Sequence, residues 1–398
     1  MAPPTGAEIS VGVSTKIALL SLCALVLAPW AGAARQPTLP GAWQRIPDAP
    51  GTASIPYARE GVWTGKHLIV FGRAGTPGAM HNVAFSYDPE TRRWRTLSPP
   101  PGDPGSYEGA TSVVWTRKLV LVWGPLTALS YEPSTNRWRQ LPTTRLLPGA
   151  PSGLLVWTGK EMITWGGGCC GEVSAKGAAY NPTTGQWRKL PAPPAAGQQR
   201  PIGVWTGREL IVLGGRQADH DERTGGAAYD PARNSWRTIA APPQERLGSM
   251  AVWDGKEVLV VGGSGPPNRQ GFHKLVSIPY AYNPVTNRWR TLSAMDGGEY
   301  GRTATTAVWT GAKLLLWGGE TQARGAYVLA PHGLAYDPAR NRWWSLPGAP
   351  LNGRVNPLVV WTGKALLAWG GDPIREQVPS ADDWWPVLDG ALFSPARA

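Results

Sequence analysis

Cysteine and histidine are scarce in this chain. The 398 residues include three cysteines and five histidines. Cys169 and Cys170 are adjacent, and neighbouring Cα atoms lie about 3.8 Å apart across a trans peptide, closer than the roughly 4.4–6.8 Å that a disulfide usually spans. The two residues form either a strained vicinal disulfide or two small residues of a glycine-rich loop. Neither arrangement joins distant parts of the chain, so its stability must come from packing.

Helical periodicity is also missing, from about residue 40 to the end of the sequence. Its absence predicts an all-β chain. The 50 glycines and 40 prolines agree with this prediction, because both residues are typical of tight turns between short strands.

Long hydrophobic runs are lacking at the amino terminus as well. The run from Ile17 to Ala28 is interrupted by Ser21, and it is shorter than the roughly 20 residues that span a bilayer. Lys16 precedes it and Ala31-Gly32-Ala33 follows it. This order predicts that residues 1–33 are a cleaved export signal, and that residues 34–398 form an exported, extracellular or cell-envelope protein.

Two alternatives for this segment stay open. The segment could remain as an uncleaved anchor, or Cys23 could be lipidated. A lipoprotein signal needs a small residue before the cysteine, and Leu22 stands there.

What the sequence does contain is a repeated unit, clearest between Arg302 and Leu346. It consists of a strand ending in tryptophan, a Thr-Gly turn, a strand ending in Gly-Gly, a polar loop, a strand carrying Tyr-Asp-Pro and a strand carrying tryptophan. Thr310-Gly311 suits a hairpin, because glycine adopts the positive φ that primed turns require. Asp337-Pro338 begins a second turn, since proline presets φ. The unit therefore predicts four antiparallel strands.

Seven copies follow one another. The tryptophans that end the seven first strands are Trp63, Trp115, Trp157, Trp205, Trp253, Trp309 and Trp361. Six fourth strands follow within the array, and their tryptophans are Trp94, Trp138, Trp187, Trp236, Trp289 and Trp343.

The seventh copy lacks its fourth strand, because the chain ends soon after Phe393. A matching strand stands at the other end, where Trp43 to Pro47 resembles Trp138 to Pro142. We therefore predict a closed seven-bladed β-propeller whose last blade is completed by the amino-terminal strand around Trp43.

The pattern of a hydrophobic strand ending in Gly-Gly, then Tyr, then Trp, at about 50-residue spacing, resembles the kelch repeat. The resemblance covers about residues 43–398. It implies a β-propeller of the kind at the centre of galactose oxidase, but no single activity, since kelch propellers include binding modules, scaffolds and a few enzymes.

Most of the 22 tryptophans occupy repeated positions. We interpret these as packing between sheets, since large rings bury much area. Trp384 and Trp385 fall outside the repeat, in the last long loop, and are candidates for stacking on a ligand or partner.

The formal charge of +12 is concentrated in arginines that flank the fourth-strand tryptophans. Charge on an outer strand blocks edge-to-edge pairing. We interpret the arginine rim mainly in this way. It could also attract an anionic cell-envelope surface. We expect no nucleic acid partner, and we expect a monomer.

Loops between second and third strands, and between one copy and the next, vary strongly from copy to copy. Variable loops on a rigid scaffold usually carry specificity, so we place the binding face there. The candidate ligand-binding residues are Tyr107, Glu108, Glu299, Tyr300, Arg302, Trp384 and Trp385. His220 and Asp221 are weaker candidates for a metal site, and neither a cofactor nor a catalytic residue is assigned.

Each enzyme alternative requires particular residues. Copper oxidation of the galactose-oxidase kind uses a Tyr joined to a Cys and a Tyr followed by His, and the sequence has no Tyr-His pair. A sugar epimerase would need a paired acid and base near the axis. We therefore expect a non-catalytic module that binds a protein or glycan, with a carbohydrate-active enzyme as the alternative.

Overall fold

The computed structural model describes residues 36–50, 60–75, 81–102, 112–124, 127–142, 153–167, 174–194, 201–215, 225–244, 246–269, 272–295, 301–323, 326–330, 332–372 and 387–396. The chain divides into residues 1–34 and residues 35–398, and only the second unit is considered below. The predicted export signal lies outside the described residues. Within them, no helix is long and apolar enough to cross a membrane.

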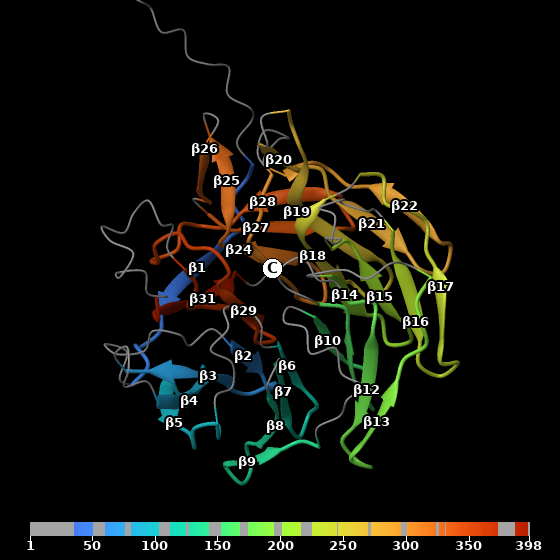
Figure 1. Ribbon diagram of the computed structural model, residues 1–398. Helices are drawn as coiled ribbons and strands as arrows, with labels where there is room; N and C mark the ends of the chain where they lie inside the picture. The colour runs from blue at the N-terminus through green and yellow to red at the C-terminus, as the bar shows by residue number, and fades with distance from the viewer. Residues whose placement is uncertain are drawn as a thin grey trace, which may run out of the picture. The chain divides into compact units, whose positions relative to one another are not determined.

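Seven antiparallel sheets follow one another in chain order around a common axis (Figure 1), which confirms the predicted seven-bladed propeller. We number the blades by their first strands. The first strands are β2 (Glu60–Trp63), β6 (Ser112–Trp115), β10 (Leu154–Trp157), β14 (Ile202–Trp205), β18 (Leu247–Trp253), β23 (Thr306–Trp309) and β29 (Leu358–Trp361). The second strands are β3 (Leu68–Ala74), β7 (Val120–Gly124), β11 (Met162–Trp165), β15 (Leu210–Leu213), β19 (Val258–Pro267), β24 (Leu314–Trp317) and β30 (Leu366–Trp369).

The third and fourth strands complete each sheet. The third strands are β4 (His81–Asp88), β8 (Thr127–Glu132), β12 (Gly177–Asn181), β16 (Ala227–Asp230), β21 (Tyr280–Asn283), β27 (Leu334–Asp337) and β31 (Gly390–Pro395). The fourth strands are β5 (Arg93–Thr96), β9 (Arg137–Gln140), β13 (Gln186–Lys189), β17 (Ser235–Thr238), β22 (Arg288–Thr291), β28 (Arg342–Ser345) and β1 (Gly41–Arg45). Three further strands, β20 (His273–Leu275), β25 (Glu320–Ala323) and β26 (Ala326–Leu329), lie outside this pattern.

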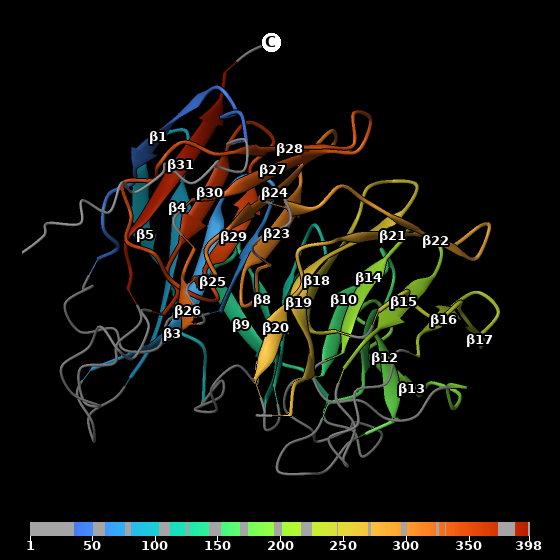
Figure 2. The ribbon, with the colours of Figure 1, turned by 90° about the horizontal axis from the view of Figure 1, so that it is seen from above.

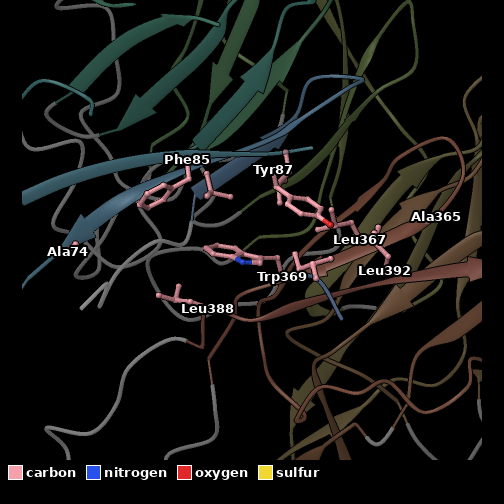
Figure 3. Packing of buried hydrophobic residues seen from close by; sticks show 11 residues of the cluster. Ala74, Phe85, Tyr87, Ala365, Leu367, Trp369, Leu388 and Leu392 are labelled. Carbon is pink, nitrogen blue, oxygen red and sulfur yellow. The ribbon is translucent and has the colours of Figure 1, made fainter. Parts of the chain in front are cut away.

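The ring closes between the last blade and the first. Each first strand contacts the first strand of the next blade, and β29 contacts β2 in the same way. A hydrophobic cluster fills this junction: Phe85 and Tyr87 of β4 pack with Trp369 of β30, and Leu388 lies on the other side of the indole (Figure 3). Burying such large rings removes roughly 150–250 Å² of surface each, so the first and last blades form one continuous core.

The amino-terminal strand completes the last sheet, as predicted. β1 lies alongside β31 (Figure 2), and Trp43 is the register partner of Phe393. The segment before it makes a second contact, which the sequence did not reveal. The Leu39 amide donates to Ser345 O over 2.8 Å, and the Ser345 amide donates to Pro37 O over 3.0 Å. Residues 37–39 therefore bind the outer strand of blade 6, and β1, which follows them in the chain, completes blade 7.

The fourth-strand tryptophans join neighbouring blades by hydrogen bonds. In every blade the indole N–H donates, over 2.7–2.9 Å, to a backbone carbonyl just after the fourth strand of the preceding blade. The seven pairs are Trp43–Pro347, Trp94–Pro47, Trp138–Ser98, Trp187–Pro142, Trp236–Pro191, Trp289–Ala240 and Trp343–Ser293. An indole N–H that is shielded from water usually finds such an acceptor, so the repeated tryptophan packs within its own blade and also binds the preceding blade.

The Gly-Gly pairs that follow the second strands also join neighbouring blades by hydrogen bonds. Gly263 donates its N–H to Arg302 O of the next blade over 2.6 Å, and Gly319 donates to Arg354 O over 2.8 Å. A Cβ built on Gly262 would lie 2.5 Å from Arg302 O, and Gly262 has a φ of +68°. Glycine is required here both by its backbone conformation and by the close approach of the neighbouring blade.

Candidate binding face

The two sets of loops lie on opposite faces of the ring. Turns between strands one and two meet turns between strands three and four, as shown by the ion pair of Lys313 with Asp337. We call this side the turn face. The Gly-Gly loops meet the segments between blades, as shown by Gly263 and Arg302, and we call this side the long-loop face. The predicted binding face is the long-loop face.

Blade 5 extends its second strand onto the long-loop face. β19 runs ten residues and pairs with β20 beyond a register shift between Ser264 and Pro267. Beyond the paired strands, the amide of Asn268 donates to Phe272 O over 2.8 Å, and the amide of Phe272 donates to the Asn268 side chain over 2.9 Å. The His273 ring lies 2.8 Å, through Nδ1, from Gly265 O. The insertion between Ser264 and Ala281 thus contains an antiparallel pair of strands, the end of β19 and β20, which we call the hairpin.

Blade 6 adds a second projection, which corrects one expectation. The segment after Gly319 was predicted to be a polar loop, but β25 and β26 form an antiparallel ribbon there (Figure 1). Its base is fixed, because the amides of Thr303 and Glu320 each donate to the other residue's carbonyl, over 3.1 and 2.9 Å. The sequence signal was Tyr327-Val328, an aromatic and a β-branched residue, which favour strands.

Hydrogen bonds join the hairpin and the ribbon. The Gln322 side chain donates to His273 O over 2.8 Å and accepts from the Leu275 amide over 3.1 Å. The Tyr327 hydroxyl also donates to His273 O, over 2.7 Å. The two hydrogen bonds of the Gln322 side chain fix the hairpin and the ribbon relative to each other, so blades 5 and 6 present one rigid unit. We call Phe272, His273, Gln322 and Tyr327 the platform.

The platform exposes an aromatic pair. The rings of Phe272 and Tyr327 lie 5.3 Å apart at 36°, and Phe272 is 40% exposed. Burial raises the pKa of the Tyr327 hydroxyl, which therefore stays protonated at neutral pH and keeps its bond to His273. An exposed ring on a fixed support is a suitable anchor for a partner, because little side-chain freedom remains to be lost on binding.

Arg302 is the one predicted site residue that the structure describes. It is 1% exposed, and its guanidinium donates to His332 O over 2.6 Å. Arg246 and Arg354 occupy the same position, the seventh residue before the first-strand tryptophan, and are also buried. Arg354 pairs with Asp389 over 2.6 Å, whereas Arg246 donates to Gly262 O and Ile278 O.

These three arginines tie the segment between blades to the loops of their own blade. Burial lowers the pKa of Arg246 to about 10, so it remains charged at neutral pH. The placement of Arg302 favours a structural role, and its ligand-binding role stays a prediction.

The other predicted site residues cannot be placed. Tyr107, Glu108, Glu299, Tyr300, Trp384, Trp385, His220, Asp221, Cys169 and Cys170 all lie outside the described residues. Among the residues that the structure does describe, no three His, Cys, Asp or Glu side chains are grouped as metal ligands. Glu320, at the base of the ribbon, is half-buried, and burial raises the pKa of its carboxyl group.

The arginine rim is partly neutralised within the blades. Arg188, Arg237 and Arg290 each form a two-pronged pair with a glutamate of the same blade, with shortest distances of 2.6–2.7 Å. The glutamates are Glu161, Glu209 and Glu257. Two of these arginines also donate to the tyrosine hydroxyl of the next blade, Arg188 to Tyr229 and Arg237 to Tyr282. These three arginines therefore link strands and blades in addition to charging the edge.

The fold and the long-loop platform define the chain as a seven-bladed β-propeller with a structured insertion on one face. No family model matches the sequence, and no curated protein sequence matches it. Among solved structures, the chain is similar to that titled "Structure of YjhT", with a TM-score of 0.51 and 15% identity over 75% of this chain and 99% of that chain. This likeness shows the fold alone.

Proposed function

We propose that this protein is an exported, non-catalytic propeller of the kelch type, which binds a protein or glycan partner through its long-loop face. The observation that carries the proposal is the platform, where two insertions from neighbouring blades are fixed to each other and expose Phe272. Loops that vary on a rigid scaffold are a common location for binding. The sequence resemblance to kelch repeats and the signal-like amino terminus support the remaining parts of the proposal.

A protein partner suits the platform better than a glycan does. Ile278 in the loop after β20 is also exposed, at 41%. Aromatic and aliphatic side chains together are typical of the apolar centre of a protein interface, whereas sugar sites need several converging hydrogen-bonding groups. The arginine rim could add attraction to an anionic envelope surface.

The test is to screen the purified protein against envelope extracts and glycans, and then to compare Phe272→Ala with the wild-type protein for the partner found. Loss of a central aromatic anchor typically costs about 2 kcal/mol, so we expect affinity to fall about 30-fold. Titration calorimetry measures the change.

Val285→Ala provides the matched control, because Val285 is 91% exposed but lies in a turn on the opposite face. It should leave the affinity unchanged. Equal affinities for wild type and Phe272→Ala would exclude the platform as the binding site. Turnover of a sugar by the wild-type protein would favour the enzyme alternative instead.

A further inference from the structure

A groove of about 710 Å³ lies on the turn face, at the junction of blades 3 and 4. This volume is within the roughly 300–1,000 Å³ typical of small-ligand sites. Its lining includes four cationic side chains, two carboxylates and one indole, which are Lys160, Arg188, Arg208, Arg233, Glu161, Asp230 and Trp205. The groove is thus separate from the platform, which lies on the long-loop face.

The floor of the groove is an ordered network. Arg188 donates to both carboxylate oxygens of Glu161, over 3.1 and 2.6 Å. Its remaining nitrogen donates to the Tyr229 hydroxyl over 2.7 Å and to the Asn234 side chain over 2.9 Å. Because Glu161 is paired through both oxygens, it contributes little repulsion to an anion bound above it.

The second carboxylate of the groove, that of Asp230, also has partners for both of its oxygens. Oδ1 of Asp230 accepts from the amides of Ala232 and Arg233, over 2.9 and 3.2 Å. Its Oδ2 atom lies 3.4 Å from the Arg233 guanidinium. Asp230 therefore holds its own turn together, and both acidic groups of the groove have cationic or amide partners.

Two cations remain, one on each wall. Lys160 stands in the first turn of blade 3 and Arg208 in the first turn of blade 4, and both side chains are exposed. Within the part of the chain that the structure describes, neither forms an ion pair. The half-buried indole of Trp205 lines the same groove. Opposed cations beside an aromatic face can bind an anionic group attached to a flat or ring-shaped body.

The sequence distinguishes this junction from the others. The positions of Lys160, Arg188 and Arg208 are cationic at several other junctions. The position of Arg233 is occupied by threonine in the turns of blades 1, 2, 3 and 5, at Thr91, Thr135, Thr184 and Thr286. Blades 6 and 7 do have arginines there, Arg340 and Arg397. However, Ala312 in the first turn of blade 6 removes a cation from both junctions, at the position of Arg208 in one and of Lys160 in the other. All four positions are cationic at the junction of blades 3 and 4.

We propose that this groove binds an acidic saccharide. Its carboxylate or sulfate would lie between Lys160 and Arg208, and its ring would lie against Trp205. The charge-assisted contacts of the anion select acidic over neutral sugars. The site is independent of the platform proposed above, so the platform can fail its test while this groove passes.

The experiment is titration calorimetry of the full chain at low salt with oligogalacturonate, a heparin oligosaccharide and neutral dextran. We expect both acidic saccharides to bind and dextran not to bind. The double variant Lys160→Ala/Arg208→Ala should bind about tenfold more weakly, because two exposed ion pairs together contribute about that much affinity. A charge-retaining variant, Lys160→Arg/Arg208→Lys, should stay within about threefold of the wild-type affinity.

The matched control is Lys66→Ala/Lys256→Ala. It removes the same charge from exposed residues in the corresponding turns of blades 1 and 5, and should change affinity by less than about twofold. Equal losses in both double variants would overturn the proposal in favour of diffuse attraction. Equal binding of dextran, displacement by inorganic sulfate at the saccharide's own concentration, or equal affinity for a DNA oligonucleotide would also overturn it.

Discussion

A chain that begins at Asp48 should fail to unfold cooperatively on heating, whereas a chain that begins at Gln36 should show one sharp transition. The first variant lacks β1, and with it the five register pairs between β1 and β31. It also lacks the Trp43 ring, which lies 5.4 Å from Phe393 and 5.9 Å from Trp317. Trp43 is half-buried, so its loss should cost less than the roughly 3–5 kcal/mol of a fully buried tryptophan. The strand pairing and the buried Ile46 are lost with it, against a total stability of roughly 5–15 kcal/mol.

The same deletion also weakens the first blade. Trp94 donates to Pro47 O over 2.7 Å, and Arg92 donates to Arg45 O over 2.9 Å. Both acceptors disappear with the segment, so blades 6, 7 and 1 all lose contacts. Differential scanning calorimetry should show the loss of the transition.

A chain that begins at Gly41 is the intermediate case. It keeps β1 but lacks residues 36–40. It should melt a few degrees lower, since two backbone hydrogen bonds with Ser345 and the bond from the Ala396 amide to Pro40 O are lost. If the chain beginning at Asp48 melted within about 2 °C of the chain beginning at Gln36, the amino-terminal strand would not be what closes the ring.

Replacing Gly262 with alanine should destabilise the protein by about 3 kcal/mol or more, from the left-handed backbone and from the clash together. The new Cβ would lie 2.5 Å from Arg302 O, which must move away. Arg302 O also accepts the Gly263 N–H, so its displacement disturbs the join between blades 5 and 6. Urea unfolding gives the free energy directly.

Gly185→Ala is a control with the same backbone conformation. Gly185 has a φ of +69°, but a Cβ there would meet nothing within 4 Å. It should therefore cost only the roughly 1 kcal/mol of the left-handed backbone. If the two variants were equally destabilised, the close approach between blades would make no contribution, and the Gly-Gly pairs would be needed for their dihedral angles alone.

Much of the fold could be predicted because its signals are local and repeated. A Thr-Gly turn specifies its own hairpin, and a tryptophan on a fourth strand packs on the tyrosine opposite it, as Tyr336 and Trp343 do at 4.8 Å. Seven repetitions then imply a closed ring. The missing strand and its match at Trp43 also sufficed to predict the closure.

The contacts between blades could not be predicted, because the acceptors lie 40–50 residues from their donors in six of the seven indole hydrogen bonds, and 304 residues away for Trp43 and Pro347. Nothing local to Trp138 indicates that its indole binds Ser98 O. Likewise, the pairing of Gln322 with His273 depends on two insertions meeting in space.

The groove escaped prediction for a different reason. The short turns of the turn face are nearly the same in every blade, and such sameness is typical of architecture rather than binding. Its cations belong to turns of two blades, and only the packing of blade 3 on blade 4 brings Lys160 and Arg208 to one groove. Arg302 was predicted to bind a ligand because it is a charged residue near a variable loop. Its guanidinium is buried against His332 O, which favours a structural role and leaves ligand binding a prediction.

Closure of the ring by the amino-terminal strand is tested most directly by a designed cross-link. Ala42 and Ser394 are register partners on β1 and β31, so Ala42→Cys with Ser394→Cys, in a chain whose own cysteines are serines, should oxidise to one intramolecular disulfide and raise the melting temperature. The pair Ala42→Cys with Leu392→Cys is out of register by two residues and should remain reduced. Oxidation of the second pair in preference to the first, or a disulfide between separate molecules, would contradict the account.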